Sequence, residues 1–158
     1  MDCVISRRGV LATAGGATAV LSLPGAAVSG QHCADPLKPI TQPPDPTPEA
    51  LIDRAFRMRR IALDLGDQPF GAVVVRDGRI IGQSWSRVVI DEDPTAHAEM
   101  AAVRDASRRL GSRDLGGAVL YSSSRPCPMC EAAAYWAGIE RMVFGRIGAD
   151  AGRPQLCR

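Results

Sequence analysis

Two short segments, far apart along the chain, restrict its fold more than any other feature. The first holds His97 and Glu99 in the order His-x-Glu, and the second holds Cys127 and Cys130 in the order Pro-Cys-x-x-Cys. A catalytic zinc ion takes three protein ligands and keeps a fourth position for water. His97, Cys127 and Cys130 meet that count, so the fold must bring them together, and Glu99 is then free to transfer protons.

Local signals around these segments predict alternating helices and strands. The run from Thr47 to Glu49 favours a helix start, and Gly66 ends the apolar spacing that follows. Asp77 and Gly78 form a typical two-residue hairpin turn. The expected elements are helix 48–65, strands 70–75 and 79–86, helix 96–110, strand 118–122, helix 126–137 and strand 141–145. Their order indicates an α/β fold with a mixed sheet flanked by helices.

The predicted elements place the metal-binding side chains at helix starts. His97 is expected in the first turn of one helix, and Cys127 and Cys130 in the first turn of another. Cysteines three residues apart share one helical face, and the positive end of a helix favours thiolate over thiol. A bound zinc ion would lower the pKa of water toward about 7–9, and Glu99 would accept the released proton.

Other uses of the same residues stay open at this point. Cys127 and Cys130 could form a dithiol redox pair or half of a structural zinc site. A redox pair gives no role to His97 or Glu99, and a closed structural site needs a fourth ligand that the sequence does not offer. A histidine taken alone is more often an ordinary core or surface residue than a metal ligand. The chain has only two histidines, however, and the other one, His32, lies in a Pro-rich segment.

Composition favours one globular domain without a nucleic-acid partner. The chain has 158 residues, is 46% hydrophobic, and carries 19 Lys and Arg against 17 Asp and Glu. A nearly neutral balance gives no strong electrostatic case for binding nucleic acid. Arginines cluster in 54–60 and 104–113, which is typical of solvated helix faces, with a polyanion site as the alternative.

The first 29 residues have the layout of a twin-arginine export signal. Arg7 and Arg8 precede an uncharged stretch over 9–23, and small residues follow over 25–30. We therefore expect export, to the periplasm of a bacterium; a disordered tail or an uncleaved anchor are the alternatives. Removal of the signal would leave 17 basic and 16 acidic residues.

A Pro-rich arm and a catalytic domain are expected after the signal. Half of the chain's 12 prolines fall in 31–48, so 30–47 is read as an extended arm and 48–158 as the domain. Cys33 and Cys157 form an even pair in an oxidising compartment once Cys3 leaves with the signal. They either form a disulfide between the arm and the C-terminus or stay as two free thiols.

Residues from about 49 to 145 resemble the cytidine/deoxycytidylate deaminase superfamily, in the branch of guanine deaminases and tRNA adenosine deaminases. The resemblance rests on Pro69–Gly78, Asp93–Met100 and Pro126–Cys130. It implies a cytidine-deaminase-like three-layer helix-sheet-helix fold, commonly a homodimer, with zinc on the His/Cys/Cys set and a glutamate as proton shuttle. The substrate-binding positions that it implies are Phe70, Ser86, Ala98 and Trp136.

Three departures from the family pattern concern the substrate. Ser86 stands where the family usually has asparagine, and serine is shorter and lacks an amide. Arg125 stands where the family usually has glutamate before Pro-Cys, which reverses a charge at the rim of the site. Only thirteen residues follow Gly145, too few for the usual closing strand and helix.

The function expected from these features is zinc-dependent hydrolytic deamination of a free nucleobase or nucleoside, guanine-like or cytosine-like, with release of ammonia. The alternatives are a tRNA adenosine deaminase, which converts adenosine to inosine, and a non-catalytic relative that binds a ligand on a zinc-bearing scaffold. A small-molecule substrate, a homodimer and no stable membrane insertion are expected.

Overall fold

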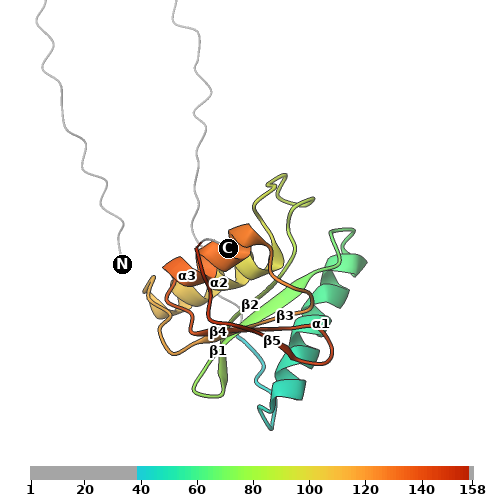
Figure 1. Ribbon diagram of the computed structural model, residues 1–158. Coiled ribbons are helices and arrows are strands. Elements are labelled where there is room, and N and C mark those ends of the chain that lie inside the picture. The colour runs from blue at the N-terminus through green and yellow to red at the C-terminus, as the bar shows by residue number, and fades with distance from the viewer. Residues whose placement is uncertain (1–38, 157–158) are drawn as a thin grey trace, which may run out of the picture. The chain divides into compact units, whose positions relative to one another are not determined.

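The chain folds into three helices and five strands in the computed structural model, which describes residues 39–156 (Figure 1). The elements are α1 (Pro48–Asp64), β1 (Gly71–Arg76), β2 (Arg79–Trp85), α2 (Ala98–Leu110), β3 (Val119–Ser122), α3 (Pro128–Trp136), β4 (Arg141–Phe144) and β5 (Ala149–Gly152). The expected signal peptide, the first part of the arm, and the pair Cys33 and Cys157 lie outside the described residues. Within 39–156, no helix is both long and apolar enough to cross a membrane.

The start and end of α1 follow the local sequence signals. Thr47 is the N-cap, and its hydroxyl accepts a 3.3 Å hydrogen bond from the N–H of Ala50. Pro48 opens the helix, where a missing N–H costs nothing. Gly66 follows the C-cap with φ +77°, a left-handed conformation that glycine adopts without steric cost.

The sheet has the strand order β2-β1-β3-β4-β5 and is mixed. β1 pairs antiparallel with both β2 and β3, whereas β3 and β4 are parallel and joined through α3. The carboxyl ends of β3 and β4 therefore meet at one edge of the sheet, next to the start of β1. The chemistry-bearing segment Pro126–Cys130 directly follows this edge.

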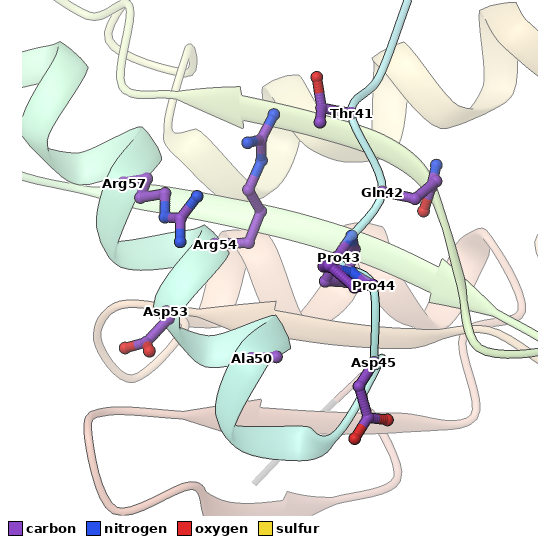
Figure 2. A pocket seen from close by; sticks show the side chains of 9 residues that line it. All are labelled: Thr41, Gln42, Pro43, Pro44, Asp45, Ala50, Asp53, Arg54 and Arg57. Carbon is purple, nitrogen blue, oxygen red and sulfur yellow. The ribbon is translucent and has the colours of Figure 1, made fainter.

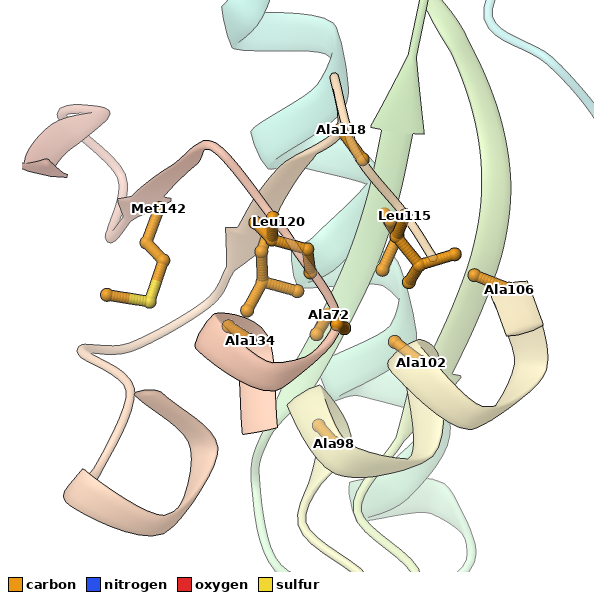
Figure 3. Close-up of a cluster of buried hydrophobic side chains, with 12 residues drawn as sticks. Ala72, Ala98, Ala102, Ala106, Leu115, Ala118, Leu120, Ala134 and Met142 are labelled. Atoms are coloured by element: carbon orange, nitrogen blue, oxygen red, sulfur yellow. The ribbon is translucent and has the colours of Figure 1, made fainter. Parts of the chain in front are cut away.

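Two apolar clusters place the helices on opposite faces of the sheet. One face packs α1 against alternate residues of the central strands, including Val73, Tyr121 and Val143. The other face packs α2 and α3 against Ala72, Leu120 and further residues (Figure 3). The three-layer α/β fold expected from the resemblance is confirmed.

Two glycines let the helices lie close to the sheet. A Cβ atom on Gly71 would meet the backbone of α1, with the N of Arg59 only 2.2 Å away. A Cβ atom on Gly82 would lie 2.5 Å from the backbone N of Ala106 in α2. Alanines on the sheet-facing side of α2 allow the same close approach, as Figure 3 shows for Ala98, Ala102 and Ala106.

The C-terminal segment differs from expectation. We expected too few residues after Gly145 for a closing strand, but β5 pairs antiparallel with β4 at the edge of the sheet. The strand needs only four residues, because the tight turn after β4 uses Gly145 and Gly148 with φ +71° and +63°. A closing helix is absent from the described part of the chain after β5.

Candidate metal centre and active site

The structure brings His97, Cys127 and Cys130 together at the starts of α2 and α3. The two sulfur atoms lie 3.6 Å apart, and each lies 3.6 Å from Nδ1 of His97. A tetrahedral zinc ion with ordinary bond lengths would separate two thiolates by roughly 3.8 Å and a thiolate from an imidazole nitrogen by roughly 3.6 Å. The three donor atoms therefore already stand at the spacing of zinc ligands.

His97 and Cys127 occupy a different helix position from the one expected. Both are N-cap residues rather than first-turn residues, and each has an extended ψ, 153° for His97 and 168° for Cys127. Neither side chain makes a capping hydrogen bond, so each is free to bind a metal. Their carbonyl groups instead accept the first helical hydrogen bonds, at 2.9 Å from Ala101 and Glu131.

The donor set suits zinc and leaves one coordination position open. Two sulfur atoms and one imidazole are soft or borderline ligands, which favour zinc over magnesium or calcium. In residues 39–156, the group of possible metal ligands contains only these three side chains. A three-ligand site is the catalytic type rather than the closed structural type. The non-bonded sulfur separation also shows that the two cysteines are not joined in a disulfide.

Glu99 lies beside this centre and is held by two neighbours. Its Oε1 accepts a 2.7 Å hydrogen bond from the hydroxyl of Ser122 at the end of β3. Its Oε2 lies 3.6 Å from the sulfur of Cys130. Because both Glu99 and Ser122 are buried, the carboxylate is fixed in direction. Sequence reasoning missed Ser122; its place at the end of a predicted strand, shortly before Pro-Cys-x-x-Cys, was the one signal that could have pointed to it.

The surroundings of Cys130 favour the neutral thiol when no cation is bound. Burial raises the pKa of the Cys130 thiol, and the nearby Glu99 carboxylate and Cys127 raise it further. We expected the start of α3 to favour the thiolate, but these opposing effects are larger. A metal ion supplies the positive charge that stabilises the thiolate against burial and against its anionic neighbours.

The substrate-binding positions implied by the resemblance divide into two groups. Phe70 and Ala98 belong to the cluster that packs α2 against the sheet, and the carbonyl of Phe70 accepts a 3.0 Å hydrogen bond from the N–H of Ser86. The Ser86 side chain is fully buried. Trp136 is 73% exposed at the far end of α3, about 13 Å from Cys127 along the helix axis. The fold therefore does not bring Trp136 to the centre within one chain.

Arg125 lies at the edge of the sheet just before the cysteines. It is exposed, and its guanidinium lies 5.9 Å from the centroid of the Phe144 ring. Phe144 ends β4 and pairs in register with Ser122. The arginine therefore places a positive charge next to the strand end that orients Glu99.

A cavity of about 450 Å³ lies elsewhere, between the arm and α1 (Figure 2). Its lining includes Gln42, Pro43, Arg54 and Arg57, and none of the residues of the metal centre. The Gln42 side chain holds the arm to the edge strand, since its amide bonds both the N–H and the carbonyl of Ile80, at 2.8 and 2.9 Å. Burial and the charge of Arg57 lower the pKa of Arg54. This cavity is not part of the candidate active site.

Comparison with known proteins agrees with this geometry. Residues 46–146 match the model of a family described as the cytidine and deoxycytidylate deaminase zinc-binding region. The chain is 46% identical over 104 residues to the guanine deaminase of Bacillus subtilis (strain 168), which covers 65% of this chain and 67% of that protein. It is 38% identical over 104 residues to the tRNA-specific adenosine deaminase of Aquifex aeolicus (strain VF5), covering 66% and 69%.

Solved structures show the same relationship. The crystal structure of guanine deaminase from Bacillus subtilis is similar with a TM-score of 0.58 at 43% identity, covering 61% of this chain and 62% of that one. A structure from a study of A-to-I editing by tRNA:A34 deaminases is similar with a TM-score of 0.59 at 42% identity, covering 61% and 70%. The guanine deaminase structure and the tRNA deaminase structure are therefore about equally similar in fold to this chain.

Proposed function

We propose that this chain, which belongs to the cytidine and deoxycytidylate deaminase zinc-binding family, acts on a free nucleobase or nucleoside, guanine-like or cytosine-like. The chain is a deaminase of this superfamily, and its relatives are zinc hydrolases. The proposal concerns the substrate, whose exocyclic amine leaves as ammonia. The observation that best supports this reaction is the position of the buried Glu99 carboxylate, which lies between the Ser122 hydroxyl and the metal-binding side chains.

Each residue of the centre has a separate task in this reaction. Zinc, when bound by His97, Cys127 and Cys130, supplies an activated water for attack on the ring carbon that carries the amine. Glu99 accepts the water proton and passes protons to the ring nitrogen and to the departing amine. The hydrogen bond from the Ser122 hydroxyl to Oε1 holds the carboxylate in position for these transfers. Burial of the carboxylate keeps bulk water from competing for them.

Two observations support a small substrate. The acidic and basic residues of the chain almost balance, with a formal net charge of +2, whereas binding to RNA phosphates needs a strong positive bias. The similarity to a guanine deaminase of Bacillus subtilis points the same way. We propose that Phe70 and Ala98 contact the base, because Ala98 directly follows the metal-binding His97 and Phe70 packs in the same cluster as Ala98.

A tRNA adenosine deaminase is the alternative, because several relatives with that name are 35–45% identical to this chain. The two functions predict opposite substrate preferences. A third possibility, a zinc-bearing relative without turnover, rests on Ser86 in place of the family's usual asparagine.

Two further parts of the proposal concern the whole protein. Export through the twin-arginine pathway is proposed from residues 1–29 and is tested by locating the mature protein in cell fractions.

A homodimer is proposed because Tyr135 and Trp136, whose rings meet edge-on 5.5 Å apart, present apolar surface on α3. Light scattering of the purified protein gives its mass directly, and a monomer at micromolar concentration would contradict this part.

The decisive experiment measures ammonia release by the purified, zinc-loaded protein. The substrates are guanine, cytosine, adenine, their nucleosides, and a tRNA anticodon stem-loop with adenosine at the wobble position. We expect turnover of a free base or nucleoside and none of the stem-loop. Turnover of the stem-loop alone would establish the alternative, and no turnover with zinc bound would favour the binding relative.

A further inference from the structure

A buried carboxylate outside the metal centre joins two loops. Asp67 lies in the connection between α1 and β1, and its side chain is buried. Its Oδ2 accepts 3.0 Å hydrogen bonds from the N–H groups of both Val89 and Ile90, in the loop between β2 and α2. Its Oδ1 accepts a 2.7 Å hydrogen bond from the N–H of Gln68. The carboxylate thus links segments that are more than twenty residues apart.

The Asp67 carboxylate stays ionised in this position. Burial raises its pKa, but hydrogen bonds from the N–H groups of Ile90, Gln68 and Val89 and the approach of the Ser86 hydroxyl lower the pKa more, below its ordinary value. The Ser86 hydroxyl is fully buried and finds no partner of ordinary hydrogen-bond geometry within residues 39–156. Ser86 therefore faces the loop anchor.

The loop that Asp67 holds contributes little to the core. The side chains of Val89 and Ile90 are 57% and 43% exposed, although both are large and apolar. Burying a charged carboxylate is unfavourable unless hydrogen bonds compensate it, and here the compensating N–H groups belong to exposed residues. Packing of the core alone therefore does not account for a buried charge at this position.

The connection that contains Asp67 also contacts the strand end next to the proton-transfer carboxylate. The N–H of Ser86 bonds the carbonyl of Phe70, and the N–H of Gly71 donates a 3.1 Å hydrogen bond to the hydroxyl of Ser123. Ser123 directly follows Ser122, whose hydroxyl orients the proton-transfer carboxylate. The connection that contains Asp67 thus touches the loop on one side and the catalytic strand end on the other.

The metal ligand at the end of the loop is held separately. The N–H of Arg87 donates a 2.9 Å hydrogen bond to the carbonyl of Ala96, which closes the loop immediately before His97. The start of α2 also fixes the His97 backbone. Loss of the Asp67 anchor would release the amides of Val89 and Ile90 while leaving the metal ligands in place.

We propose that Asp67 is a positioning residue that fixes the loop Arg87–Ile90 against Phe70 and so shapes the entrance through which the substrate reaches Glu99. The inference rests on the proposed function for its kinetic consequences, and on the hydrogen bonds of Asp67 for the anchor itself. It predicts that the anchor contributes to substrate binding rather than to proton transfer. Loss of the anchor should therefore raise KM and leave kcat nearly unchanged.

The test compares the Asp67→Ala and Asp67→Asn variants with Asp91→Ala as a matched control. Asp91 lies in the same loop, but its side chain is exposed and, among residues 39–156, pairs at the surface with Arg87 alone, at 2.5 Å. For each zinc-loaded protein, hydrogen exchange of the Val89 and Ile90 amides, zinc content, KM and kcat are measured. Asp67→Asn keeps one acceptor oxygen and the side-chain shape, so it replaces Asp67→Ala in these measurements if Asp67→Ala does not fold.

In Asp67→Ala we expect faster exchange at Val89 and Ile90, unchanged zinc content, a KM raised about tenfold and a kcat within about threefold of wild type. Asp67→Asn should fall between Asp67→Ala and wild type, and Asp91→Ala should match wild type. Unchanged exchange, or faster exchange with an unchanged KM, would overturn the inference. A parallel fall of kcat and zinc content would show a purely structural role and would also overturn it.

Failure of the proposed function is recognised separately. If wild-type protein deaminates none of the bases or nucleosides, the proposed function is wrong whatever the variants do. The affinity for 8-azaguanine, a guanine analogue, is then measured by calorimetry in place of KM. Equal affinity of wild type and Asp67→Ala would overturn the positioning role.

Discussion

The hydroxyl of Ser122 donates a 2.7 Å hydrogen bond to Oε1 of Glu99, and both side chains are buried at the metal centre. A hydrogen bond to a charged group contributes roughly 1.5–3 kcal/mol, and every 1.4 kcal/mol corresponds to about a tenfold change in rate. We therefore expect Ser122→Ala to lower kcat by roughly 10- to 100-fold with zinc still bound.

Ser123→Ala is the matched control for this prediction. Ser123 is also buried, one residue further along, but its hydroxyl accepts the N–H of Gly71 and does not touch Glu99. This variant should be destabilised by roughly 1–3 kcal/mol, because a buried N–H loses its partner, while kcat of the folded protein is kept. Equal losses of kcat in the two variants would contradict the role of the Ser122 hydroxyl in orienting Glu99.

Glu99→Gln removes the proton-transfer group and keeps its size. We expect kcat to fall by at least about 10²- to 10⁴-fold, the usual contribution of a general acid or base. Zinc content should not fall, because Glu99 is not one of the three metal-binding side chains. Ammonia release and metal analysis on the same sample test this, and full turnover by Glu99→Gln would contradict the mechanism.

Zinc binding should weaken as the pH falls. Burial, together with Glu99 and Cys127, raises the pKa of the Cys130 thiol, so the metal-free protein keeps this thiol protonated at neutral pH. Binding then releases a proton, and the affinity should fall about tenfold per pH unit for each proton released. Competition with a chelator between about pH 6 and about pH 8 measures this slope. An affinity independent of pH would contradict ligation by the Cys130 thiolate.

Asp67 should contribute to stability in the acid range. Its pKa is lower in the folded protein than in the unfolded chain, because its hydrogen bonds outweigh burial, and Arg87 lies near enough to interact with its charge. A lowered pKa stabilises the fold above the unfolded value of about 3.9, and this stability is lost as the pH falls through the folded value. Denaturation midpoints of Asp67→Asn should therefore approach those of wild type toward low pH. A constant difference at all pH values would contradict the role of its charge.

Gly82→Ala should disrupt the contact between α2 and β2. The added Cβ would lie 2.5 Å from the backbone N of Ala106, and backbone atoms cannot move away as a flexible side chain can. We expect a loss of stability of at least about 1–3 kcal/mol, measured by denaturant unfolding. Gly116→Ala is the control, because its nearest neighbour is an exposed side-chain oxygen of Asp114 at 3.2 Å. A similar loss in both variants would show that helix-to-sheet contact is not the cause.

Local sequence signals predicted most of the fold because each acts over a few residues. The helix start at Thr47 and the hairpin turn at Asp77 and Gly78 depend on capping and backbone conformation alone, and both appear as expected. β5 escaped prediction because its sequence, Ala149–Gly152, has no strand-like alternation of its own. It forms because β4 presents a free edge next to a tight glycine turn.

The sequence alone determined the chemistry of the centre, since His97, Glu99, Cys127 and Cys130 supply a complete zinc donor set and a proton carrier at recognisable spacings. Only the tertiary structure decided how that chemistry is held. Ser122 reaches Glu99 across 23 residues, and Asp67 reaches Val89 across 22. Contacts of this kind leave no periodicity or spacing in the sequence, because they depend on which strand ends and loops the sheet brings together.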